Sequence, residues 1–223
     1  MAEGKPTLAV LGGTGKEGSG LAARWAAAGY DVVIGGRDAA KAEAAAAELA
    51  AEIPGANVRG ADNATAAAAG EIIVLAVPYA AQQATALGVA DALQGKILVD
   101  VTVPLVPPKV NRVQLPEGGS AVVALQKALG DGVRVVSAFQ NISAHHLRDL
   151  HHDLDCDVLV AGDDIDAREQ VIVLAEAAKL RGFHAGPLCN SVVAEALTSV
   201  LISINQRYKV PSAGIRITGL SGE

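Results

Sequence analysis

Residues 7–18 read TLAVLGGTGKEG, and this segment is the strongest indication of the fold class. A short apolar run leads straight into a glycine-rich turn, and an alanine-rich segment of helical composition follows. In that context the spacing of Gly13, Gly15 and Gly18 predicts a strand, a turn and a helix that bind the pyrophosphate of a dinucleotide. Gly13 permits the tight turn, Gly15 lets the backbone approach the phosphates, and Gly18 allows the helix to lie close to the strand. The N–H groups at the start of the helix supply donors for the anion.

A loop that binds nucleoside triphosphates is a competing interpretation, because Gly15-Lys16 matches part of that motif. The complete motif needs Gly at position 10 and Ser or Thr at position 17, where this chain has Val10 and Glu17. The competing interpretation therefore fails.

The second predicted strand ends where an NAD enzyme places an acid that binds the ribose 2′-hydroxyl. Residues 36–41 of this chain instead read GRDAAK. Arg37 and Lys41 stand one helical turn apart and can both reach a 2′-phosphate, while Asp38 is placed to cap the following helix. Solvated surface charges are the alternative interpretation of these two cations. The pattern favours NADP(H) over NAD(H).

Over the first hundred residues, short apolar runs alternate with longer alanine-rich segments. This alternation predicts an α/β fold of the Rossmann type, a doubly wound parallel sheet with helices on both faces. The predicted strands are Thr7–Leu11, Asp31–Gly35, Asn57–Gly60, Ile72–Val77, Ile97–Asp100 and Val133–Ser137. The predicted helices are Gly15–Ala28, Ala39–Glu52, Ala64–Ala69, Ala80–Leu93 and Ser120–Leu129. The proline-rich residues 102–119 are predicted to form an irregular loop, either beside a ligand or as a plain surface excursion.

After about Gln140 the pattern changes, which predicts a second, smaller unit. It contains a predicted strand at Val158–Ala161, an amphipathic helix at Ile165–Leu180 and a nearly continuous apolar helix at Ser191–Arg207. We expect residues 1–140 to form the NADP-binding Rossmann domain and residues 141–223 to form a small C-terminal α/β domain. The apolar helix is predicted to be buried on most faces, inside that domain or at a subunit interface, and it suggests a homodimer.

The chain has 223 residues, of which 51% are hydrophobic, and a formal net charge of −6 at pH 7. Such a chain can bury a core, and its acidity argues against nucleic acid or an anionic membrane as a partner. Its two cysteines show no CxxC spacing, and its N-terminus lacks the apolar core of a signal peptide. No apolar run approaches the roughly 20 residues of a membrane span. The nearest, Val192–Ile204, is interrupted by Glu195, so we expect a cytoplasmic protein without a membrane segment.

Residues for acid/base or metal chemistry are not evident. None of the three tyrosines has a lysine four residues further on, a spacing that could serve proton transfer. The polar residues His145, His146, Asp149, His151, His152 and Asp153 invite a zinc or iron hypothesis. Adjacent side chains usually point in different directions, however, so a polar loop or helix surface is favoured. We predict no catalytic side chain and no metal site, which fits a hydride transfer between two tightly held cofactors.

The chain resembles the NADP-dependent reductases of coenzyme F420, a deazaflavin, over nearly its whole length. The glycine turn is common to many reductases, whereas the C-terminal segments are much more specific. The segments that carry the resemblance are Leu11–Gly15, the tip formed by Gly36, Arg37 and Lys41, Val77–Tyr79, Ser137–Ala144, Gly186–Ser191 and Glu195–Thr198. The resemblance implies a two-domain Rossmann protein that transfers a hydride reversibly between C4 of the nicotinamide and C5 of the deazaflavin.

The resemblance also implies the cofactor contacts. The phosphate contacts fall on Thr14, Gly15, Lys16 and Glu17, and the 2′-phosphate contacts fall on Gly36, Arg37 and Lys41. The residues that flank the nicotinamide or the deazaflavin are Val77, Tyr79, Val103, Ile142 and Ala144, and Ala213 contacts the deazaflavin through its backbone. The C-terminal domain completes the deazaflavin cleft. Candidates for binding the acidic tail of the coenzyme are Lys109, Arg112, Arg207 and Lys209.

Four features of the sequence depart from the family pattern. Gly36 stands where family members often have Ser, which removes one hydroxyl contact to the 2′-phosphate, and Tyr79 replaces a Trp. Lys16-Glu17 replaces a common Asn-Leu, so that Lys16 adds a cation near the pyrophosphate while Glu17 is expected to turn away from it. The residues from Gln140 to Ser143 replace a common His-Thr-Ile-Pro, which changes the deazaflavin contacts.

Two other functions remain open. An NADPH-dependent ferric or flavin reductase uses a similar Rossmann half, and the histidine group slightly favours it. A protein that binds NADP without turnover is the second, although the chain has no basic stripe or DNA-binding extension that would suggest a regulator.

Overall fold

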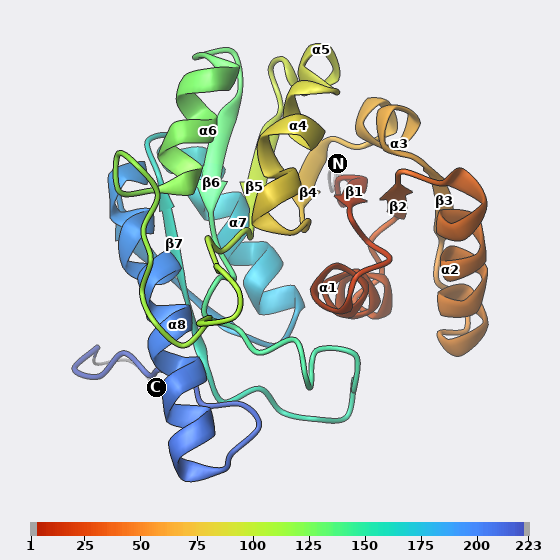
Figure 1. Cartoon of the computed structure of the whole chain (residues 1–223). Coiled ribbons are helices and arrows are strands. Elements are labelled where there is room, and N and C mark those ends of the chain that lie inside the picture. The colour runs from red at the N-terminus through yellow and green to blue at the C-terminus, as the bar shows by residue number, and fades with distance from the viewer. Residues whose placement is uncertain (1–3, 221–223) are drawn as a thin grey trace.

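The computed structural model describes residues 4–220, so the outer ends of the two expected domains, residues 1–3 and 221–223, lie outside the described residues. One eight-stranded sheet has the strand order β3-β2-β1-β4-β5-β6-β7-β8 (Figure 1). Strands β1 to β6 run parallel in the doubly wound Rossmann order, and β7 joins them antiparallel to β6. The strands are β1 (Leu8–Leu11), β2 (Val32–Gly36), β3 (Val58–Asp62), β4 (Ile72–Leu75), β5 (Ile97–Asp100), β6 (Arg134–Ser137), β7 (Asp157–Gly162) and β8 (Arg181–Gly186).

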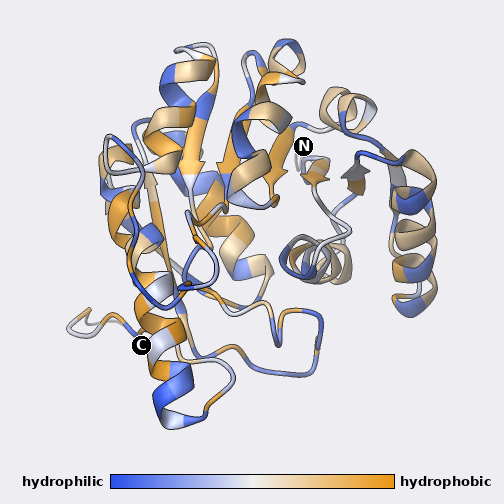
Figure 2. Ribbon diagram, viewed as in Figure 1, coloured by the Kyte–Doolittle hydropathy of each residue, from blue (hydrophilic) through white to orange (hydrophobic). Residues whose placement is uncertain are grey.

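Helices cover both faces of the sheet. Successive strand residues point to opposite faces, so Leu8 and Val10 belong to one core while Ala9 and Leu11 belong to the other. Helices α1, α2 and α7 close the first core, and α3 to α6 close the second. Figure 2 shows the apolar colouring that this double burial requires along the central strands. The helices are α1 (Lys16–Ala27), α2 (Ala39–Glu52), α3 (Asn63–Ala69), η1 (Tyr79–Ala81), α4 (Gln82–Leu87), α5 (Ala90–Leu93), α6 (Ala121–Leu129), α7 (Ile165–Ala177), η2 (Leu188–Asn190) and α8 (Ser191–Tyr208).

Local chemistry sets the helix starts and the spacing of the layers. Asp38 and Asp62 each accept a hydrogen bond from the backbone N–H three residues on, and they cap α2 and α3. Helix α2 lies so close to β3 that a Cβ at Gly60 would stand 2.3 Å from the backbone of Ala42. The small side chains of the alanine-rich segments are therefore a packing requirement.

Three elements differ from the prediction. The expected helix Ala80–Leu93 is divided into η1, α4 and α5, with a break at Gly88 and Val89. Helix α7 ends at Ala177 instead of Leu180, because Lys179 takes the left-handed conformation with a φ of 59°. Strand β8 was not predicted, since it lies at the sheet edge, is only partly buried and lacks an apolar alternation.

Helix α8 is less buried than its composition predicts. Val193 is 57% exposed and Val200 is 45% exposed, so the expectation of burial on most faces is wrong for the single chain. Within residues 4–220, Leu188–Tyr208 is the one helical segment that is long and apolar enough, with a mean hydropathy of 1.4, to cross a membrane by length and composition. The segment contains Glu195 and Arg207, so it is not an uninterrupted apolar run, and the expected absence of a membrane segment stays a prediction. The core helix of a soluble protein meets the same criteria, so this segment is weak evidence for a membrane span.

The C-terminal part extends the same sheet and ends in a tail that is tied to it. Strand β7 pairs with β6, and β8 pairs with β7. The carboxylate of Asp157 accepts a hydrogen bond from the N–H of Ile217 at 2.6 Å and lies 2.8 Å from Arg181 and 3.4 Å from Arg216. These contacts hold the tail against β7. The division into two domains at residue 140 stays a prediction.

Candidate functional site

The turn between β1 and α1 brings backbone close to backbone. Gly12 has a φ of +81°, and a Cβ there would lie 2.4 Å from the carbonyl oxygen of Ala76. A Cβ at Gly13 would lie 2.9 Å from the carbonyl oxygen of Val10, and one at Gly18 would lie 2.6 Å from that of Gly12. Gly12 therefore supplies the left-handed residue of the turn, whereas Gly13 and Gly18 are required by close packing.

The start of α1 is open to an anion. The N-cap residue Gly15 offers no side chain to the first-turn N–H groups, and Thr14, Gly15 and Lys16 are exposed beside them. Uncapped N–H groups at a helix start attract negative charge, because their dipoles point outward. Three of the four predicted phosphate residues thus lie where a pyrophosphate can meet the helix.

The two cations predicted to bind a 2′-phosphate lie at one hollow beyond the end of β2. The hollow has a volume of about 290 Å³ and is lined by Thr14, Gly36, Arg37, Asp38 and Lys41. The carboxylate of Asp38 accepts a hydrogen bond from the N–H of Lys41 at 3.3 Å, as expected for a helix cap. Arg37 and Lys41 are exposed, so a phosphate entering the hollow would meet two positive side chains.

A wider groove continues from this hollow and was not predicted. It has a volume of about 550 Å³ and shares Gly36 and Arg37 with the hollow, while α3 and α4 contribute small residues such as Ala64 and Ala84. Asn63 is part of its lining, and its buried Oδ1 atom has no hydrogen-bond partner. The flat, mostly small-residue lining fits an aromatic ring such as adenine. The available sequence signal was the polar pair Asp62-Asn63 directly at the end of β3.

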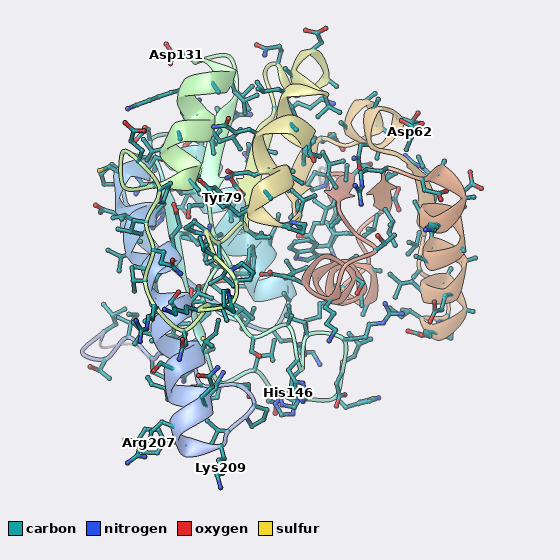
Figure 3. All side chains as sticks on the ribbon, in the orientation of Figure 1. Asp62, Tyr79, Asp131, His146, Arg207 and Lys209 are labelled. Atoms are coloured by element: carbon teal, nitrogen blue, oxygen red, sulfur yellow. The ribbon has the colours of Figure 1, made fainter. Side chains whose placement is uncertain are left out.

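The residues predicted to flank the reacting rings follow the carboxyl ends of β4, β5 and β6. Val77 and Tyr79 (Figure 3) come after β4, and Val103 comes after β5. Ile142 and Ala144 come after β6, and Ile142 lines a cavity of about 110 Å³ together with Ala213 from the tail. The fold thus brings Ile142 and Ala213 together, at the opposite end of the site from the hollow beyond β2.

Glu17 is half-buried in the first turn of α1, and the expectation that it turns away from the pyrophosphate stays a prediction. Its Oε1 atom is buried and has no hydrogen-bond partner. Burial, and then the charge of Asp100, raises the pKa of Glu17 to about 8.

Asp100, the last residue of β5, is fully buried and was not predicted as part of the site. Its carboxylate accepts hydrogen bonds from the amide of Gln82 and, at 2.9 Å, from the N–H of Thr102. Burial raises the pKa of Asp100 to about 6, although these hydrogen bonds oppose the shift. The available signal was an acid in the final position of an otherwise apolar strand.

The histidine segment is an irregular loop between β6 and β7. The rings of His146 and His152 stack with centroids 3.9 Å apart, and His145 meets His146 edge-on at 4.5 Å. In the part of the chain that the structure describes, no group of three His, Cys, Asp or Glu side chains is placed to hold a metal ion. The segment is a loop, as the favoured interpretation expects, and the absence of a metal site stays a prediction.

Four basic residues predicted to bind an acidic tail come from two elements that touch. Asn111 donates a hydrogen bond to Gln206 at 2.8 Å and joins the proline-rich loop to the end of α8. Figure 3 shows Arg207 and Lys209 at that end of the helix. All four basic side chains are exposed; they are Lys109, Arg112, Arg207 and Lys209.

Comparison with known proteins gives consistent results. Residues 7–104 match the family described as NADP oxidoreductase coenzyme F420-dependent. The chain is 44% identical over 220 residues to an F420-dependent NADP reductase of Methanothermobacter marburgensis, with 96% of this chain and 98% of the relative covered. The protein of the same name from Methanocaldococcus jannaschii is 40% identical over 222 residues, again with 96% and 98% covered. A crystal structure of a putative F420-dependent NADP reductase from Arthrobacter sp. FB24 superimposes with a TM-score of 0.80 at 28% identity, covering 96% of this chain and 100% of that one.

Proposed function

The chain belongs to the family of F420-dependent NADP oxidoreductases, and from this premise we propose that it transfers a hydride reversibly between NADP(H) and the deazaflavin coenzyme F420. The observation that carries the proposal is that the open start of α1 lies beside the hollow of Arg37 and Lys41. The first fits a pyrophosphate and the second fits a 2′-phosphate. A dinucleotide held at these two points extends its nicotinamide over the ends of β4 and β5.

In this reaction the chain binds and orients two ring systems. Val77, Tyr79 and Val103 would lie against the nicotinamide. The hydride passes directly from carbon to carbon, so no side chain gives or takes a proton at the reacting carbons. The protein then accelerates the reaction by holding the two rings in contact.

Residues 141–223 are proposed as the C-terminal domain that completes the deazaflavin site. Ile142 and Ala144 would contact the ring, and Ala213 would contact it through the backbone. The N–H of Ala213 already donates to the side chain of Asn205 at 2.7 Å, so the proposed contact uses its carbonyl oxygen. The basic group at Asn111 and Gln206 would attract the acidic tail of the coenzyme.

Anaerobic mixing of the purified protein with NADPH and F420 tests the proposal. We expect rapid loss of the deazaflavin absorbance and no bleaching of FMN under the same conditions. Reduction of FMN or of a ferric salt, with F420 unchanged, would instead indicate the ferric or flavin reductase. No change with any acceptor, despite NADPH binding, would indicate binding without turnover.

We also propose that the protein is a cytoplasmic homodimer. Val193 and Val200 leave apolar surface on the outside of α8, and a second copy would remove that surface from water. Cys156 and Cys189 are both free thiols, which suits a reducing compartment. Sedimentation at micromolar concentration tests the assembly, and a monomer would contradict it.

A further inference from the structure

The last turn of α8 holds the segment of the tail that leads to Ala213. The helix ends at Lys209, which takes the left-handed conformation with a φ of 56°. The backbone carbonyl of Asn205 accepts a hydrogen bond from the N–H of Val210 at 3.2 Å, and its side-chain Oδ1 accepts one from the N–H of Ala213 at 2.7 Å. One residue of α8 thus closes both ends of residues 210–213, which we call the tail loop.

Other elements hold the chain beside the tail loop and beyond it. The hydroxyl of Ser143, between β6 and β7, donates a hydrogen bond to the carbonyl oxygen of Pro211 at 3.4 Å. The carbonyl oxygen of Ile215 accepts a hydrogen bond from the N–H of Asp157, the first residue of β7, at 2.9 Å. The tail beyond the tail loop therefore stays attached to β7 without the side chain of Asn205.

The tail loop forms part of the wall of the cavity of about 110 Å³. Ala213 lines this cavity together with Ile142. On one side of Ala213 the chain packs closely, since a Cβ at Gly214 would lie 2.7 Å from the Sγ atom of Cys156. On the other side it is held by the half-buried Asn205. The peptide group of Ala213 is thus fixed from both sides.

A backbone group binds a ring well only if its orientation is set before the ring arrives. The Oδ1 atom of Asn205 occupies the N–H of Ala213, which leaves the carbonyl oxygen for the deazaflavin. We propose that Asn205 is a positioning residue for deazaflavin binding, whose side chain holds the peptide group of Ala213 against the ring and takes no part in the hydride transfer. This inference rests on the proposed function, which puts Ala213 in contact with the deazaflavin.

The neighbour of Asn205 on α8 holds a different segment. The side chain of Gln206 accepts a hydrogen bond from Asn111 of the proline-rich loop at 2.8 Å. That contact belongs to the basic group proposed to attract the acidic tail of the coenzyme. Asn205 and Gln206 thus act on separate segments, so the contacts to the ring and to the acidic tail can be tested separately.

Equilibrium dialysis of Asn205→Ala with two ligands tests the proposal. The ligands are F420 and a deazariboflavin that has the same ring without the acidic tail. We expect the Kd to rise by about 3- to 10-fold for both, because one preorganised hydrogen-bonding group is lost, while the Kd for NADPH stays unchanged. In turnover, the KM for F420 should rise while kcat changes by less than about twofold. Asn205→Asp keeps an acceptor oxygen and should restore the Kd for the deazariboflavin.

Hydrogen exchange tests whether Asn205 acts through the tail loop. The amide of Ala213 should exchange faster in Asn205→Ala and at the ordinary rate in Asn205→Asp, because only the first variant lacks the acceptor. Asn57→Ala, at an exposed position before β3, is the matched control and should alter neither exchange at Ala213 nor any Kd.

Three results would overturn the inference. A loss confined to F420 would show that Asn205 acts through the basic group, and an equal loss for NADPH would show a general structural role. An unchanged Kd for both deazaflavins, despite faster exchange at Ala213, would show that the orientation of the peptide group does not matter. If the unmodified protein binds neither deazaflavin, the proposed function itself fails, so the two failures are distinguishable.

Discussion

Arg24 is a buried cation whose replacement should loosen the loop that carries the histidines. It lies on α1, is 3% exposed, and donates hydrogen bonds to five backbone carbonyl groups. Two of these bonds, to Leu147 at 2.8 Å and to Ala178 at 3.1 Å, are buried. The other three acceptors are the carbonyl oxygens of His146, Asp149 and His152, in partly buried positions. Arg24→Met keeps much of the length of the side chain and removes every donor.

The expected loss comes from the two buried carbonyls, because the other three can bind water. A buried acceptor that loses its partner destabilises a protein by about 1–3 kcal/mol, so two give about 2–6 kcal/mol. We therefore expect Arg24→Met to lower the free energy of unfolding by about 4 kcal/mol. For a chain of this size, about 2–4 °C per kcal/mol then gives a fall in Tm of about 8–16 °C.

Urea unfolding and amide hydrogen exchange would measure the effect. Exchange should accelerate first in residues 145–152, because Arg24 donates hydrogen bonds to four carbonyl groups of that loop. Arg24→Lys should lose less stability, since it keeps the charge and part of the donors, and Arg59→Met, at an exposed position of β3, should change stability by less than about 0.5 kcal/mol. A loss below about 1 kcal/mol for Arg24→Met would contradict this prediction, because it would mean that the buried carbonyl groups find other donors.

Three further predictions concern the site and the tail. Arg37→Ala should weaken NADPH binding by about 1.5–3 kcal/mol, or about 10- to 150-fold, and leave NADH binding little changed; equal losses for both nucleotides would contradict the assignment. Gly36→Ser should tighten NADPH binding about fivefold in the same titration, because a Cβ there meets no atom closer than 3.4 Å and a hydroxyl can reach the 2′-phosphate. Burial opposes ionisation of Asp157, but Arg181, the Ile217 N–H and Arg216 outweigh it and lower the pKa of Asp157. The contribution of Asp157 to stability is therefore present above the ordinary Asp pKa and is lost as the pH falls through the lower pKa of the folded protein. Digestion of the tail by carboxypeptidase should begin in that acidic range for the unmodified protein, and already at pH 7 for Asp157→Asn.

The parts of the fold that sequence predicts are those determined by local patterns. The glycine turn, the cations Arg37 and Lys41 and the first six strands each depend on residues within a few positions of one another. The contacts of Arg24 join residues more than 120 positions apart, and no local sequence pattern predicts them. Strand β8 was missed for a related reason, because an edge strand is stabilised by pairing with β7 and needs no apolar face of its own.

The position of Glu17 follows from a local sequence pattern, whereas the surroundings of its side chain depend on the fold. In sequence it stands in a phosphate turn where a carboxylate would repel the ligand, which predicts only that it turns away. The fold determines what surrounds its side chain: the Oε1 atom is buried without a hydrogen-bond partner, and burial raises the pKa of Glu17 to about 8.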